Sequence, residues 1–157
     1  MTKAIYFDMD GTIADLYNYP NWLECLNNCD VAPYENAQPL ANMDELNDIL
    51  DRLAAIGYII GVITWTAMNG TKEYNKATRN AKKAWIKKYL PCVTEFHAVK
   101  YGTPKHVTAN VKGGILVDDN ADVRTAWENY TEENFTIDAT DTQEMMNNLK
   151  NLLAIAA

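Results

Sequence analysis

The stretch Asp8-Met9-Asp10-Gly11-Thr12 determines how the rest of the chain is interpreted. It follows the apolar run 4–7, Ala-Ile-Tyr-Phe, which predicts a buried strand with Asp8 at its end. Because side chains alternate along an extended chain, the carboxylates of Asp8 and Asp10 point the same way, and Gly11 then allows a sharp turn. The stretch therefore predicts two acids at the carboxyl edge of a sheet, where ligands bind in open α/β folds.

Two carboxylates held this close together need a cation, a shared proton or water between them. Mg²⁺ is the ordinary cation for such a pair, because it binds carboxylate oxygen and keeps water ligands that a phosphate can replace. A solvated acidic turn is the alternative interpretation of the same residues. The features that follow along the chain decide between the two.

Length and composition are typical of one globular domain spanning residues 1–157. Apolar residues make up 48% of the chain and charged residues 22%, which are ordinary fractions for a soluble protein. The net charge of −7 argues against general affinity for nucleic acid or membranes, and no apolar run is long enough for a membrane helix. The three cysteines form neither a disulfide framework nor a zinc pattern, which predicts reduced thiols and a cytoplasmic location.

Apolar runs and amphipathic repeats alternate along the chain. Helices are expected between Asn42 and Gly57, over 72–89, over 121–130, and after Asp141. Further strands are expected over 58–63, 93–99, 115–117 and 135–137. This alternation predicts an α/β fold, a five-stranded parallel sheet with helices on both faces.

Residues 16–41 interrupt the alternation with three prolines and four aromatic residues. The segment is too short to have a core of its own, so we expect a short flap inserted over the acidic pair after the first strand. Its aromatic side chains are expected to pack beneath the loop, and stacking on a substrate is the alternative.

The expected helix over 72–89 carries half of all the basic residues of the chain. They are Lys72, Lys76, Arg79, Lys82, Lys83, Lys87 and Lys88. Such a run usually forms the solvated face of a helix, and attraction of an anionic substrate is the alternative. The opposite, packed face is expected to contain Tyr74, Ala77, Ala81, Ala84 and Trp85.

Chemically active side chains follow four of the predicted strands and should meet at one edge of the sheet. They are Asp8 and Asp10, then Thr64, then Lys105, and finally Asp118, Asp119 and Asp122. A carboxylate nucleophile with a second carboxylate as acid and base can hydrolyse a phosphate ester in two steps. A hydroxyl, a lysine and Mg²⁺ can neutralise the phosphate oxygens during such a reaction.

The order of these motifs (DxDGT, a strand-end threonine, a lysine, then hhhDDxxxD) resembles the haloacid dehalogenase (HAD) superfamily of phosphohydrolases over essentially the whole chain. The resemblance implies a three-layer Rossmann-like core with Asp8 as nucleophile and Asp10 as general acid and base. Asp10 also favours a phosphatase, because the dehalogenases of the superfamily lack this second acid. Thr64 and Lys105 would bind the phosphate, with Lys100 as the alternative lysine.

The same resemblance implies a Mg²⁺ site formed by Asp8, Asp118 and the backbone carbonyl of Asp10. Asp119 or Asp122 would complete or support this metal shell. The insert over 16–41 is short, and the segment 99–113 has no room for a cap, so the chain resembles the capless or minimally capped members of the superfamily. Such an open site suits a bulky substrate or a partner subunit that acts as a lid, and is therefore compatible with an oligomer.

The substrate is expected to be a nucleotide or another small phosphomonoester, because the DMDGTIAD run and the DD motif are similar to those of 5′(3′)-deoxyribonucleotidases. The chain also resembles small HAD-like proteins encoded by bacteriophages. A polynucleotide 3′-phosphatase is the alternative, suggested by the open site and the basic helix, and the net acidity tells against it. A catalytically silent Mg²⁺-binding interaction module is the alternative of another class, because fold and function can separate.

Overall fold

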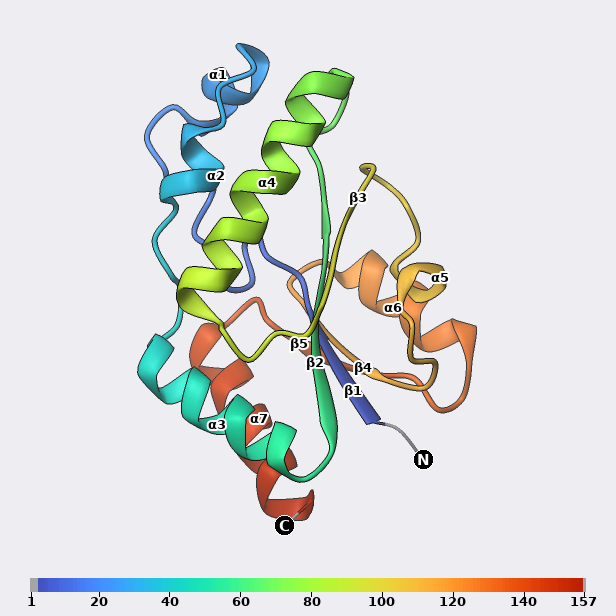
Figure 1. Cartoon of the computed structure of the whole chain (residues 1–157). Coiled ribbons are helices and arrows are strands. Elements are labelled where there is room, and N and C mark those ends of the chain that lie inside the picture. The colour runs from blue at the N-terminus through green and yellow to red at the C-terminus, as the bar shows by residue number, and fades with distance from the viewer. Residues whose placement is uncertain (1–2, 157) are drawn as a thin grey trace.

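The computed structural model describes residues 3–156 and contains a five-stranded parallel sheet of order β3-β2-β1-β4-β5 (Figure 1). The strands are β1 (Lys3–Phe7), β2 (Tyr58–Trp65), β3 (Glu95–Val99), β4 (Ile115–Asp118) and β5 (Phe135–Asp138). This topology confirms the predicted α/β fold. Two boundaries were wrong: β2 continues through Trp65, so that Thr64 lies within the strand, and β3 begins only at Glu95.

Helices lie on both faces of the sheet (Figure 1). On one face are α3 (Met43–Ala55), α4 (Lys72–Tyr89) and α7 (Thr142–Ala156), and on the other are α5 (Lys105–Thr108) and α6 (Ala121–Tyr130). Side chains cap the first turns of α3 and α4, since Asn42 accepts from the N–H of Glu45 and Thr71 accepts from the N–H of Tyr74, each at 3.1 Å. Among the described residues, no helix combines the length and the apolar character needed to cross a membrane.

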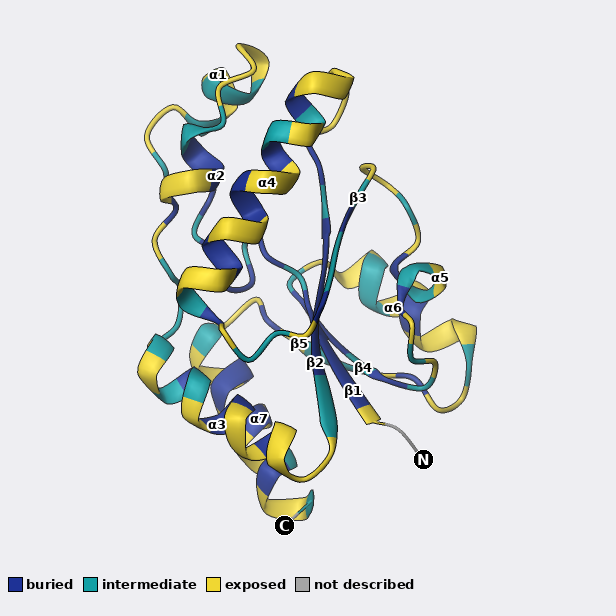
Figure 2. Ribbon diagram, in the orientation of Figure 1, coloured by how far each residue is buried: buried dark blue, intermediate teal, exposed yellow. Residues whose placement is uncertain are grey.

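The core is divided by the sheet into two apolar layers, which follow from the alternation of side chains along β1. Ile5 and Phe7 pack with α3, α4 and α7, whereas Ala4 and Tyr6 pack with β4 and α6 on the other face. Both layers exclude water, and Figure 2 shows the middle strands as almost wholly buried. A sheet covered on both sides leaves its carboxyl edge as the place where polar side chains can gather.

The insert over 16–41 forms two short helices, α1 (Trp22–Asn27) and α2 (Ala32–Asn36), which lie beside the upper part of α4 (Figure 1). No helix was assigned around Pro33 from the sequence, whereas in the structure this proline occupies the first turn of α2, where proline is tolerated. Tyr34 is buried against Tyr74 and Ala81 of α4, as expected for a packed aromatic residue. The hydroxyl of Tyr74 in turn donates to the carbonyl of Asp30 at 2.9 Å, which attaches the insert to the helix.

Candidate active site

Two neighbouring strands bring their acidic ends together. Phe7 of β1 is paired with Val117 of β4, so Asp8 and Asp118 leave the sheet side by side, and the N–H of Asp8 donates to the carbonyl of Val117 at 2.9 Å. Asp119 follows directly, and one carboxylate oxygen from each of the three residues lies within 4.8 Å of the others. The register of the parallel pair thus builds a cluster of three carboxylates at the carboxyl edge.

Lys105 lies between two of these acids. Its Nζ is 2.7 Å from Asp8 Oδ1 and 2.7 Å from Asp118 Oδ2, and the side chain is only 3% exposed. Burial alone would lower the pKa of this lysine, but the charges of Asp8 and Asp118 outweigh it and raise the pKa, so Lys105 stays protonated. Lys100, the alternative lysine, is exposed just after β3 and contributes only its carbonyl, which accepts from Thr103.

Asp119 lacks a basic partner within residues 3–156 and is held by Thr12 instead. The Thr12 hydroxyl lies 3.1 Å from Asp119 Oδ1 and accepts from the N–H of Asp119 at 3.2 Å. Burial, followed by the negative charges of Asp8 and Asp118, raises the pKa of Asp119 to about 6. Burial, followed by the negative charge of Asp8, also raises the pKa of Asp118, against the opposing effect of Lys105.

Asp10 is paired with a lysine of its own, Lys82. Lys82 of α4 places Nζ 2.7 Å from Asp10 Oδ2, 2.8 Å from Thr64 Oγ1 and 2.7 Å from the carbonyl oxygen of Trp65. Burial raises the pKa of Asp10, and the positive charge of Lys82 opposes this. A raised pKa is what a carboxyl group needs to serve as a proton donor near neutral pH.

The balance of charge in the site leaves room for a divalent cation. Three carboxylates, those of Asp8, Asp118 and Asp119, face the single ammonium group of Lys105. This is an excess of two negative charges in a partly buried space, which a divalent ion would cancel. Hard cations such as Mg²⁺ prefer carboxylate oxygen, so Asp8, Asp118 and Asp119 fit such an ion by both charge and donor type.

Asp122 does not join this cluster. It lies exposed in the first turn of α6, where its N–H donates to Asn120 Oδ1 at 3.0 Å. Of the two residues expected to support a metal shell, the structure therefore brings only Asp119 to the acids.

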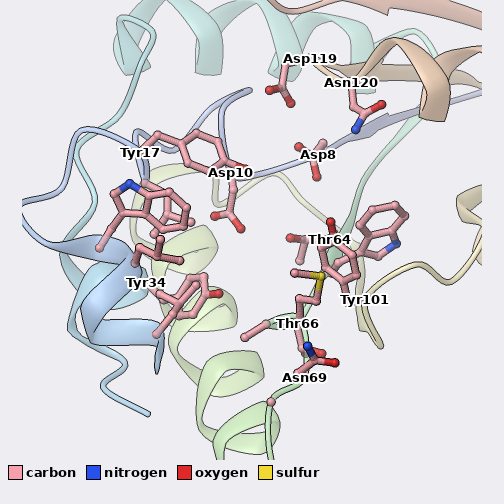
Figure 3. Close-up of a pocket in the computed structure, with 18 of the residues that line it drawn as sticks. Asp8, Asp10, Tyr17, Tyr34, Thr64, Thr66, Asn69, Tyr101, Asp119 and Asn120 are labelled. Atoms are coloured by element: carbon pink, nitrogen blue, oxygen red, sulfur yellow. The ribbon is translucent and has the colours of Figure 1, made fainter. Parts of the chain in front are cut away.

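A cavity of roughly 450 Å³ opens in front of the acids, and Figure 3 shows Asp8 and Asp10 projecting into it. Aromatic rings line both sides of this space. Tyr17 and Trp22 of the insert stack edge to face at 5.0 Å on one side, and Trp65 and Tyr101 lie 5.0 Å apart on the other. The cavity thus combines a charged floor with aromatic walls.

Lys82 is the functional residue that sequence reasoning missed, because it was counted among the basic residues of a solvated helix face. In the structure it is buried, along with Thr78 and Ile86, whereas Ala84, expected on the packed face, is exposed. The spacing contained the signal, since Lys82 lies four residues after Thr78 and four before Ile86, on one helix face. Thr12, part of the quoted stretch, was likewise not recognised as a partner of Asp119.

The fold of this chain is similar to that of a solved phosphatase. The crystal structure of D,D-heptose 1,7-bisphosphate phosphatase from Burkholderia thailandensis matches with a TM-score of 0.57, over 98% of this chain and 99% of that chain, at 15% sequence identity. This likeness agrees with the three-layer Rossmann-like core expected from the sequence. No protein-family model matches the sequence, and neither does any curated protein.

The raised pKa of Asp119 generates a prediction about stability. Its folded pKa of about 6 lies above the ordinary value of 3.8, so ionisation destabilises the metal-free fold above pH 6, and this cost disappears as the pH falls to 4. Asp119→Asn keeps the Oδ1 acceptor for Thr12 and removes the charge. We expect it to raise the Tm of the metal-free protein at pH 7.5 by roughly 3 °C and to leave the Tm at pH 4 unchanged.

Asp122→Asn is the matched control, because it makes the same chemical change three residues away at an exposed position. It should leave the Tm unchanged or lower it slightly by removing a charge from the N-terminus of α6. Thermal melting in the presence of a chelator measures both variants. Equal effects of the two substitutions at pH 7.5 would contradict the repulsion inferred within the acid cluster.

Proposed function

We propose that this chain is a Mg²⁺-dependent phosphomonoester hydrolase of the haloacid dehalogenase type, in which Asp8 forms an aspartyl-phosphate intermediate. The observation that carries the proposal is the position of Lys105, which is 2.7 Å from both Asp8 and Asp118, while Asp10 is paired with Lys82. The motif order and the fold shared with a phosphatase of the same superfamily support it.

In the first step, an oxygen of Asp8 attacks phosphorus and the bond between phosphorus and the leaving oxygen breaks. The leaving oxygen takes a proton from Asp10, whose raised pKa suits a general acid. The hydroxyl of Thr64 and the ammonium of Lys105 balance the charge on the phosphate oxygens. The products are an alcohol and a phosphoryl group bound to Asp8.

In the second step, Asp10 is a carboxylate and takes a proton from a water molecule as the oxygen of that water attacks phosphorus. The bond between phosphorus and Asp8 breaks, inorganic phosphate leaves, and both aspartates return to their starting protonation states. The two carboxylates thus have separate roles, and each has its own lysine to set its surroundings.

Asp8, Asp118 and Asp119 would hold Mg²⁺, together with the backbone carbonyl of Asp10. When bound, the ion supplies positive charge to the phosphate oxygens and neutralises the repulsion among the acids. The side chains of Asp8 and Asp118 are also fixed by Lys105, so they are oriented before an ion arrives.

The aromatic walls of the cavity favour a leaving group with a planar, partly apolar body, such as the nucleoside part of a nucleotide. Tyr17 and Trp22 on one side and Trp65 and Tyr101 on the other face the space where that group would lie. A ring inserted between aromatic side chains gains stacking energy on either face. A small nucleotide is therefore the substrate that we favour for this site.

The first test is phosphate release from 5′- and 3′-nucleotides and from sugar phosphates, with and without Mg²⁺. We expect Mg²⁺-dependent release, with nucleotides as the better substrates, and a loss of at least about 10³-fold in Asp8→Asn, because removal of a nucleophile leaves only residual catalysis. Asp51→Asn, an exposed site on α3, serves as the control and should retain full activity.

Retained hydrolysis in Asp8→Asn would exclude the aspartyl-phosphate intermediate. Hydrolysis that is independent of Mg²⁺ would exclude the proposed role of the metal. If wild type releases no phosphate from any substrate but gains thermal stability from Mg²⁺, the chain is better described as a silent metal-binding module.

The assignment of the phosphate-binding lysine is tested in the same assay. Lys105→Met should reduce kcat/KM by at least about 100-fold, because removal of a preorganised charged donor costs this much or more. Lys100→Met should remain within about 3-fold of wild type, because its side chain is exposed and outside the cluster. The reverse pattern would transfer the role to Lys100.

A second candidate function, polynucleotide 3′-phosphatase, is favoured by one feature of α4. Exposed basic residues recur every three or four positions and so form a stripe along one side of the helix. They are Lys72, Lys76, Arg79, Lys83 and Lys87. The stripe begins next to Met68, Asn69 and Gly70, which line the cavity. Figure 2 shows exposed positions, in yellow, recurring along the length of α4.

Within residues 3–156 the basic stripe has no carboxylate partner, although Arg79 Nε donates to the carbonyl of Ala98 at 2.9 Å, so its lysine charges are free to bind a phosphate backbone. Under this second candidate, the triple variant Lys76→Glu, Lys83→Glu, Lys87→Glu should lower kcat/KM for a 3′-phosphorylated oligonucleotide by at least about 10-fold at low salt. The triple variant should also make kcat/KM for the oligonucleotide less dependent on salt concentration. Activity on a mononucleotide should stay within about 2-fold, because that substrate does not reach the stripe.

Lys88→Glu is the control, because this residue lies on the same helix outside the stripe. If the triple variant changes both substrates equally, or neither, the stripe is an ordinary solvated face and the polynucleotide function is excluded.

A further inference from the structure

Lys82 is a charged side chain with no exposure to solvent, in the middle of α4. Burial of an ammonium group is costly unless its charge is paired and its protons are bonded. All three of its N–H donors have acceptors at 2.7–2.8 Å: Asp10 Oδ2, Thr64 Oγ1 and the carbonyl of Trp65. The ring of Tyr34, from the insert, covers the same nitrogen at 4.8 Å.

We propose that Lys82 is a positioning residue, which holds the general acid Asp10 and the phosphate-binding hydroxyl of Thr64 in their working orientations. This inference rests on the proposed phosphatase function and adds a residue that the motifs resembling the HAD superfamily do not include. Lys82 has no donor left for a substrate, because an ammonium group has three and all are used. Its effect on the reaction must therefore pass through the groups that it holds.

For Asp10, the bond from Lys82 fixes the orientation of the carboxyl group. Oδ2 is occupied by Lys82, while Asp10 itself lines the cavity. Rotation of the carboxyl group out of its plane would lose the bond to Lys82, so one oxygen stays on Lys82 and the other is left for the leaving group. A general acid acts only within hydrogen-bond reach of the oxygen that it protonates, and a fixed carboxyl group meets this requirement.

For Thr64, the bond from Lys82 decides where the hydroxyl proton points. Oγ1 accepts from Lys82 at 2.8 Å, so its own hydrogen is directed away from the ammonium group. Thr64 also lines the cavity, and Figure 3 shows it there together with Asp8 and Asp10. The hydroxyl is thus left as a donor for a phosphate oxygen, which is the role expected of this residue.

The test is the dependence of kcat/KM on the leaving group, measured with p-nitrophenyl phosphate and benzyl phosphate, which are similar in size. p-Nitrophenolate leaves without protonation, whereas benzyl alkoxide needs a proton from the general acid. In Lys82→Met, kcat/KM for benzyl phosphate should fall about 100-fold further than that for p-nitrophenyl phosphate. Asp10→Asn should show the same selective loss.

The ratio of the two kcat/KM values is measured on one preparation, so the fraction of folded enzyme cancels. Lys82→Gln, which can still donate hydrogen bonds, should recover part of the ratio. Lys88→Met is the matched control, the same change at an exposed position of α4, and should leave the ratio unchanged. Adding Lys82→Met to Asp10→Asn should change the ratio by less than about 3-fold, because both act through one group.

Equal losses on both substrates in Lys82→Met, or additive effects in the double variant, would overturn the proposal and leave Lys82 as a structural residue. These outcomes differ from failure of the proposed function itself, in which wild type hydrolyses neither ester in an Asp8-dependent manner. That result would remove the reaction for which Lys82 is proposed to position its partners, and the inference would fall with it.

Discussion

The structure around the cavity depends on the neutralisation of acids that the sheet forces together. Parallel pairing of β1 with β4 brings Asp8 beside Asp118, whose side chain is only 1% exposed. Lys105 lies between them with 2.7 Å to each. Without this bridge, the two carboxylates would repel each other in a space largely shielded from water. The short helix α5 supplies the bridge, because Lys105 is its first residue.

The site has two halves with the same design, an acid paired with a buried lysine from an adjacent helix. Lys105 of α5 serves Asp8, and Lys82 of α4 serves Asp10, from opposite faces of the sheet. Local rules of stability are broken in both halves, since Lys105 begins a helix and Lys82 is wholly enclosed. Such departures are expected where a fold has been shaped for chemistry.

The sequence was sufficient for the sheet, most helices and the acidic motifs, because hydrophobic period and capping residues report on local geometry. It was insufficient for Lys82, because the burial of this side chain depends on contacts with residues far away in the sequence. These are Tyr34 of the insert and Asp10, which follows β1. The helix α2 was also not predicted, although Pro33 lies in its first turn, where proline is accommodated. The phosphate-binding and metal-binding roles of the site residues stay predictions.

The distances along the chain between the partners in this site have a consequence for folding. Lys82 lies 72 residues from Asp10, Lys105 lies 97 from Asp8, and Thr12 lies 107 from Asp119. Contacts of such long range form late, because the loop closure entropy must be overcome first. During synthesis the acidic stretch emerges before either lysine, so the compensated cluster is absent until β4 has docked beside β1. The complete site therefore forms only when the whole sheet has assembled. In a partly folded chain, Asp8 and Asp10 still lack their lysine partners.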